Sequence, residues 1–203
     1  MADNTAEQTR RSPDPRRRSQ RARNAILDAA AELLGEVGYS KLTMEAIAAR
    51  ARVGKQTIYR WWPSKAAVVF DVFTRLTGAT AGAPLPDTGD LAADLKTVFR
   101  ATADEFTDPE TDRTTRAFTA EIQHDEELAR AVTERLVEPN NRAVRDRLSS
   151  GRAAGQIAPE ADLELAAEML SGPINHRWLL RTGPLTHEYV DRLVDTVLRG
   201  LRP

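Results

Sequence analysis

Six consecutive positions, 55–60, carry five polar side chains of the kinds that bind nucleic acid: Lys55, Gln56, Thr57, Tyr59 and Arg60. Amide and hydroxyl groups can hydrogen-bond the base edges in a DNA groove, and cations can contact the phosphates. In a short helix, the apolar Ile58 turns toward the core and leaves these five side chains on the outward face. The residue types therefore predict a helix that contacts DNA.

Two helices around a tight turn are predicted to position this outward face. The segment Leu42–Lys65 reads LTMEAIAARARVGKQTIYRWWPSK. Thr43 is suited to cap its first helix, because the hydroxyl accepts from an unpaired N–H. Ile47 and Ala48 fall on the inner face, which Ile58 then covers. An ordinary helical hairpin shares this apolar spacing, but the polar outward face and the flanking charges favour a helix-turn-helix, whose second helix enters the DNA major groove.

Together with the helix before it, this segment resembles the DNA-binding domain of the tetracycline-repressor (TetR-like) family. The matching stretches are AILDAAAELLGEVGY at 25–39, LTMEAIAARA at 42–51 and VGKQTIYRWWPSKAAVV at 53–69. Arg52 stands where the family usually has a small residue in the turn, and Gly54 where it often has a Ser or Thr N-cap. Trp61 and Trp62 stand in place of Tyr and Phe. If the turn needs positive φ at Arg52, this residue costs about 1 kcal/mol there.

The resemblance implies a homodimer that binds a palindromic operator in double-stranded DNA. We expect Gln56, Thr57 and Tyr59 to contact bases or the groove. In the family, the position of Lys65 is a phosphate contact, and a cation in the first turn of a helix, against the dipole, fits such a role. Lys55, Arg60 and Trp61 are also expected at phosphates. The full predicted DNA-binding set is Thr43, Lys55, Gln56, Thr57, Tyr59, Arg60, Trp61 and Lys65.

The charge is divided between a basic N-terminal part and an acidic remainder. Residues 1–65 hold 13 Lys or Arg against 7 Asp or Glu, a net charge of +6, whereas the remaining residues carry −7. Such an asymmetry attracts a polyanion to one end of the molecule. Residues 1–18 lack aliphatic side chains other than Met and Ala and are predicted to form a disordered basic arm. The arm either follows the DNA backbone or minor groove, or is a solvated tail.

Helical periodicity without strand signals predicts an all-α fold. We expect an N-terminal three-helix helix-turn-helix DNA-binding domain over 19–77, a linker over 78–90, and a C-terminal helical bundle for ligand binding and dimerisation over 91–203. Gly38 is expected to stop the first helix near Val37 in the left-handed conformation. Pro139 should kink a long helix over 125–149, and Gly172-Pro173 should break the helix that Asp162 caps. Thr186 is expected to cap the last helix.

The last two helices carry broad apolar stripes that we interpret as half of an intermolecular four-helix bundle. The stripes comprise Leu163, Ala166, Leu170, Ile174 and Trp178 in one helix and Val190, Leu193, Val194, Val197, Leu198 and Leu201 in the other. Ordinary packing within the chain is the alternative. The resemblance favours dimerisation through these two helices.

The resemblance also implies a small-molecule pocket in the C-terminal domain. Pockets combine aromatic walls with a few polar groups. The expected ligand-binding residues are therefore Phe99, Phe118, Glu121, His124, Met169, His176 and Trp178, with Phe106 and Tyr189 as further candidates.

Other classes of function have little support in the sequence. The 203 residues contain no cysteine, no apolar run long enough to span a bilayer, and no phosphate-binding glycine loop, HExxH or Gly-x-Ser-x-Gly motif. The three His show no metal-ligand spacing. We therefore expect a cytoplasmic, ligand-responsive transcriptional repressor that needs no metal or cofactor and is not an enzyme. The alternative is an architectural or activator DNA-binding dimer without a small-molecule ligand.

Overall fold

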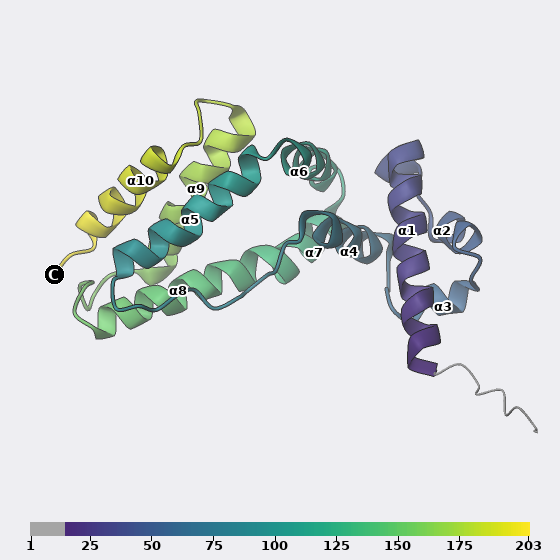
Figure 1. Ribbon diagram of the computed structural model, residues 1–203, viewed down its shortest axis with the longest axis horizontal. Helices are drawn as coiled ribbons and strands as arrows, with labels where there is room; N and C mark the ends of the chain where they lie inside the picture. The colour runs from purple at the N-terminus through teal and green to yellow at the C-terminus, as the bar shows by residue number, and fades with distance from the viewer. Residues whose placement is uncertain (1–14) are drawn as a thin grey trace, which may run out of the picture. The chain divides into compact units, whose positions relative to one another are not determined.

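The structure, a computed structural model, describes residues 15–203, and within these residues it contains helices and no strand. The all-α prediction is confirmed. The helices are α1 (Pro15–Lys41), α2 (Met44–Arg50), α3 (Lys55–Tyr59), α4 (Lys65–Thr77), α5 (Leu91–Thr107), α6 (Pro109–Ile122), α7 (Glu126–Val132), the π-helix η1 (Thr133–Val137), α8 (Glu138–Ala153), α9 (Leu163–Leu180) and α10 (His187–Gly200) (Figure 1).

The chain divides into two compact units, and the division differs from the predicted domains. The first unit ends at Val72 and the second begins at Phe73, so the boundary lies inside α4 and not in the segment 78–90. That segment has no helix, but it is fastened to the second unit: the Gly82 N–H donates to Asn140 Oδ1 at 2.8 Å. Its glycines and prolines signalled irregular backbone, and the hydrogen bonds assign it to the C-terminal unit.

Helix α1 is longer at both ends than predicted. It begins at Pro15, so residues 15–18, expected in the disordered arm, are helical, because proline is well suited to the first turn of a helix. The rest of the expected arm, residues 1–14, lies outside the described residues. Gly38 interrupts the helical dihedrals with φ 75° and ψ 169°. Its φ is positive as expected, but its ψ is extended, and one further turn follows to Lys41.

The interruption predicted at Pro139 takes the form of a π-helical segment. The Glu138 N–H donates to the carbonyl of Thr133, five residues earlier, and Pro139 then stands in the first turn of α8. Proline has no N–H and is tolerated at that position. The extra residue of the π turn is thus accommodated where the α-helical ladder would be broken.

The break predicted at Gly172-Pro173 is wrong. Helix α9 runs without interruption from Leu163 to Leu180, with Pro173 inside it. A proline within a helix costs roughly 3 kcal/mol. Leu170, Ile174 and Trp178 are buried on either side of it. Each fully buried apolar side chain contributes about 1.5–3 kcal/mol, so packing outweighs the lost hydrogen bond.

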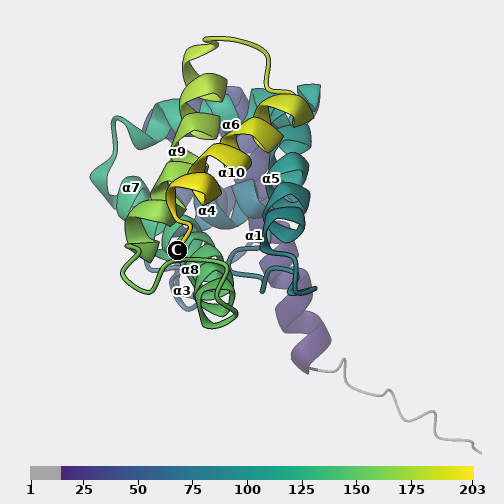
Figure 2. The same cartoon turned by 90° about the vertical axis from the view of Figure 1, so that its left-hand side faces the viewer.

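The core of the second unit is formed by one face each of α5, α8, α9 and α10. Its buried members include Leu95, Phe99, Leu148, Ala166, Leu170, Ile174, Val190, Val194 and Val197. Helix α10 lies along α5 and α9 (Figure 1, Figure 2). The apolar stripes expected to face a second subunit are therefore largely buried within the chain, as the alternative interpretation of these stripes holds, and dimerisation through the last two helices stays a prediction for their remaining faces.

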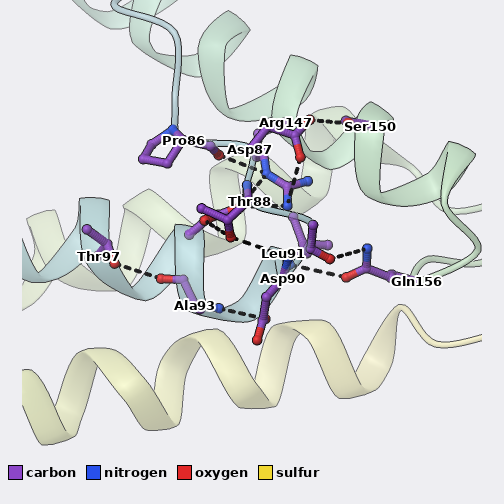
Figure 3. Close-up of polar contacts among 12 residues, drawn as sticks. Pro86, Asp87, Thr88, Asp90, Leu91, Ala93, Thr97, Arg147, Ser150 and Gln156 are labelled. Atoms are coloured by element: carbon purple, nitrogen blue, oxygen red, sulfur yellow. Dashed lines mark hydrogen bonds and ion pairs between the residues drawn. The ribbon is translucent and has the colours of Figure 1, made fainter.

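A buried ion pair joins α5 to α8 and holds the segment 78–90 against them. The Arg147 guanidinium donates to Asp94 Oδ2 at 2.8 Å and to the Pro86 carbonyl at 3.0 Å, with both charged side chains 3% exposed (Figure 3). Burial raises the pKa of Asp94, but hydrogen bonds from the Thr88 N–H, Arg147 and the Thr88 hydroxyl outweigh it and lower that pKa below its usual range. Both charged groups thus have several hydrogen-bond partners, as a buried ion pair requires.

The turn between α2 and α3 places Arg52 at a positive φ of 54°, which is the condition under which the sequence predicts strain at this residue. The left-handed region costs a residue with a Cβ roughly 1–2 kcal/mol. We therefore predict that Arg52→Gly raises the free energy of unfolding by about 1 kcal/mol, measured by urea denaturation. Ala49→Gly, in the right-handed interior of α2, is the matched control and should lower it by about 1 kcal/mol. Equal effects of the two glycines would contradict the strain at Arg52.

Candidate nucleic-acid interface

Helices α2 and α3 form the helix-turn-helix that the sequence predicts. Thr43 caps α2, since its hydroxyl accepts from the Ala46 N–H at 3.1 Å. Ile47 and Ile58 are fully buried, and the Val53 N–H donates to the Ala48 carbonyl at 3.0 Å across the turn. Gly54 caps α3 without a side-chain hydrogen bond. Helix α3 is too short to be stable alone. Its orientation is fixed by the backbone of the turn and by the two buried isoleucines.

The side chains of α3 divide as predicted into one buried residue and a polar outward set. Lys55, Gln56 and Tyr59 are exposed, as is Arg60 at the C-cap, and Thr57 is half-buried. The half-burial of Thr57 limits it to contacts at the edge of the face. The outward set presents an amide, hydroxyls and cations together, which is the chemistry of a surface that reads DNA.

The two tryptophans after α3 have different environments. Trp61 is 37% exposed and lies beside Arg60, whose guanidinium is 5.7 Å from the ring centroid. Trp62 is 2% exposed, and its indole N–H donates to Asp71 Oδ2 at 2.9 Å. Trp61 is thus the tryptophan on the outer surface, and Trp62 belongs to the support.

Asp71 of α4 also accepts from Arg23 of α1, at 2.9 Å, and the Arg23 guanidinium lies 5.6 Å from the Trp62 ring. These three residues form what we call the Arg23–Trp62–Asp71 cluster, which connects the C-terminal end of α3 to α1 and α4. The cluster was not predicted from the sequence. A signal was present, because Asp71 is the single charged residue in the apolar run AVVFDVF, and an acid that is largely removed from water needs partners.

Lys65, predicted to bind phosphate, has a partner within the first unit. Its ammonium donates to the Tyr39 carbonyl at 3.1 Å and lies 4.1 Å from the Tyr39 ring centroid. The carbonyl belongs to the last turn of α1, where a cation is favourable. An ammonium has three donors, so Lys65 retains two for a phosphate while it anchors the start of α4.

Three further ion pairs lie on the described surface of the first unit. Lys55 Nζ is 3.0 Å from Glu45 Oε1, and the hydrogen bond from Lys55 lowers the pKa of Glu45. Arg50 of α2 reaches Glu32 and Glu36 of α1 at 3.1 and 2.8 Å. These pairs are exposed, so water and salt screen them and each contributes little to stability.

The residues predicted to bind a ligand are not gathered into one pocket. Phe118 stacks on Phe73 with ring centroids 4.2 Å apart, Phe99 is in the core, and Trp178 stacks on Phe106 and donates to Asp112 at 2.6 Å. His124, Met169 and His176 are exposed and Glu121 is half-buried. None of them lines a cleft of about 580 Å³ between the segment 81–87 and residues 134–150. The aromatic residues were recognisable, but their mutual packing was not.

Among residues 15–203, no three His, Asp or Glu side chains are placed to hold a metal ion together. None of the helices over the same residues combines the length and apolarity needed to cross a membrane.

The fold and the exposed polar face of α3 are those of a helix-turn-helix transcription regulator. Residues 26–72 match the bacterial regulatory proteins of the tetR family, and residues 85–197 match the tetracyclin repressor-like C-terminal domain. The chain therefore belongs to the TetR family of transcriptional regulators, and it binds DNA as a member of that family.

Related proteins are similar to this chain in sequence or in structure over most of its length. The uncharacterized regulator YdeS of Bacillus subtilis is 34% identical over 92% of this chain and 93% of its own length. The DNA-binding transcriptional repressor TetR of Mycobacteroides abscessus is 30% identical over 86% of this chain and 90% of its own. Among solved structures, the TetR family regulator SCO0332 superposes with a TM-score of 0.66 at 33% identity, covering 90% of this chain and 99% of that one. The flavonoid-responsive regulator FrrA has a TM-score of 0.69 at 25% identity, covering 91% and 98%.

The Arg23–Trp62–Asp71 cluster generates a prediction about stability. Trp62→Phe keeps the ring but removes the donor to Asp71, and should lower the free energy of unfolding by about 1–2 kcal/mol. With Arg23→Met, a double-mutant cycle should give a coupling energy above about 0.5 kcal/mol, measured by urea denaturation followed by circular dichroism. Trp61→Phe is the matched control and should change stability by less than about 0.5 kcal/mol. Equal costs for the two tryptophans would exclude the proposed anchoring.

Proposed function

We propose that this protein is a ligand-responsive transcriptional repressor that binds a palindromic operator as a homodimer. The observation that carries the DNA-binding part is the outward face of α3, with Gln56, Tyr59 and Arg60 exposed over the buried Ile58. Gln56, Thr57 and Tyr59 contact bases or the groove in this proposal. Lys55, Arg60, Trp61 and Lys65 supply phosphate contacts, and Thr43 does so from the N-cap of α2.

A second copy is required because one short helix contacts too few base pairs. Two recognition helices bind half-sites about one helical turn apart, roughly 34–36 Å. The feature that supports a dimer is the face of α9 left uncovered by the core, where Leu165, Met169, Leu179 and Leu180 are exposed. With a helical repeat of 3.6 residues, these side chains project to the same side. We propose that this outer face of α9, with α10 beside it, pairs with its copy.

Repression and release by a small molecule are proposed from two similar proteins. The Mycobacteroides abscessus relative is a repressor, and FrrA responds to flavonoids. The scattered positions of the predicted pocket residues favour the alternative of an activator or architectural dimer without an effector. A small molecule that raises the unfolding temperature and also releases the protein from its duplex would decide between them.

The DNA contacts generate a prediction that separates sequence reading from generic affinity. Lys65→Ala should weaken binding to every duplex and reduce the slope of log K against log salt concentration by about 1 per protomer. Gln56→Ala should instead change base preference, with a loss of about 1–3 kcal/mol at the preferred base pair. Both are measured by fluorescence anisotropy on a duplex identified by genome-wide mapping of bound sites. If neither variant alters binding to that duplex, α3 is not the recognition helix.

The dimer prediction concerns the outer face of α9. Leu165→Glu combined with Met169→Glu should convert the dimer to a monomer, because like charges would be buried opposite each other. Sedimentation velocity measures the mass, and circular dichroism checks that the helices persist. Val137→Glu, which also charges an exposed apolar position, is the control and should leave a dimer. A dimer that survives both α9 substitutions places the interface elsewhere.

A further inference from the structure

A salt bridge crosses the turn of the helix-turn-helix on its exposed side. Glu45 stands in the first turn of α2, and Lys55 is the first residue of α3. The Lys55 ammonium is 3.0 Å from the Glu45 carboxylate, while the two side chains remain 62% and 54% exposed. The pair is therefore not part of the core, and its partners are free to exchange when DNA arrives.

Glu45 is an acidic residue next to a segment in which all charged residues are basic. Residues 46–65 contain no Asp or Glu and five basic residues, Arg50, Arg52, Lys55, Arg60 and Lys65. Of these, Arg50 is held by Glu32 and Glu36 of α1, and Lys65 by the carbonyl of Tyr39. Lys55 is the outward cation at the start of α3 that a carboxylate from α2 neutralises. Glu45 thus reduces the positive potential of the surface that meets phosphates.

We propose that Glu45 is a selectivity residue for DNA binding that acts through Lys55. Non-specific affinity comes almost entirely from cation–phosphate contacts. On an arbitrary duplex the protein has no fixed register, so Lys55 reaches a phosphate only by leaving Glu45, and the pair weakens binding. On the operator, base contacts hold the protein in one register, in which Lys55 can donate to a phosphate while another of its three donors stays on Glu45. The pair therefore lowers non-specific affinity more than operator affinity.

This proposal rests on the proposed DNA-binding function and concerns its regulation by charge. The test compares the full-length protein with Glu45→Gln, Lys55→Met and the double variant. Glu36→Gln is the matched control, because Glu36 is an equally exposed acid that pairs with Arg50. The probes are a random-sequence 30-base-pair duplex and the duplex enriched by genome-wide mapping, each titrated at several salt concentrations with circular dichroism as the check on folding.

Glu45→Gln should tighten binding to the random duplex by about two- to fivefold per protomer, the size expected from releasing one exposed ion pair. It should also steepen the salt slope by about 1 per protomer. The gain on the enriched duplex should be smaller, so the ratio of the two affinities falls. The effect should disappear when Lys55 is already Met, whereas Glu36→Gln should behave like the wild type.

Two outcomes would overturn the proposal while leaving the DNA-binding function intact. In the first, Glu45→Gln binds both duplexes as the wild type does. In the second, its gain persists in the Lys55→Met background, so that Glu45 acts by repulsion alone. If instead the wild type binds no duplex, the proposed function itself fails, and that result is distinguishable from either of these.

Discussion

The carboxylate of Asp71 in α4 connects the residues that follow α3 to Arg23 of α1, which lies 48 positions earlier in the chain. It accepts from Trp62, which follows the recognition helix, and from Arg23 in the middle of α1. A helix of five residues has almost no stability of its own, so its orientation depends on what holds its two ends. The turn after α2 fixes the first end and the Arg23–Trp62–Asp71 cluster fixes the second. The backbone of α3 is therefore held in one orientation, so its exposed side chains have the fixed positions that base recognition requires.

Exposed and buried ion pairs have different roles in this structure. The Lys55–Glu45 and Arg50–Glu36 pairs of the first unit lie at the surface, where water and salt weaken them and their partners can exchange. The Arg147–Asp94 pair of the second unit is buried, and its hydrogen bonds connect the two side chains to each other and to the segment 78–90. Removing one partner there leaves an unpaired buried charge, which costs far more than losing a surface pair. The first arrangement suits a surface that exchanges partners, and the second suits a scaffold.

Local features were predictable from the sequence, and long-range pairings were not. Thr43, Asp162 and Thr186 cap their helices as expected because a cap involves residues only two or three positions apart. Arg52 has its positive φ for the same local reason. The pairing of Asp71 with Arg23 spans 48 positions, and periodicity contains no information about it. Amphipathic stripes in α9 and α10 indicated that those faces are buried, but not whether the same chain or a second copy buries them. Phe118 and Trp178 are aromatic residues of the pocket-forming kind, yet Phe73 and Phe106 cover them.

The π-helical segment at 133–137 is in effect one inserted residue that the helix has absorbed. Each residue advances an α-helix by about 100° around its axis. The wide turn takes up this extra residue locally, so the faces of α7 and α8 keep nearly the phase that a regular α-helix would give them. The length of this segment can therefore change by one residue without a change in the core: loss of a residue within Thr133–Val137 would leave an ordinary α-helical turn, and Arg147 of α8 would still face Asp94 of α5.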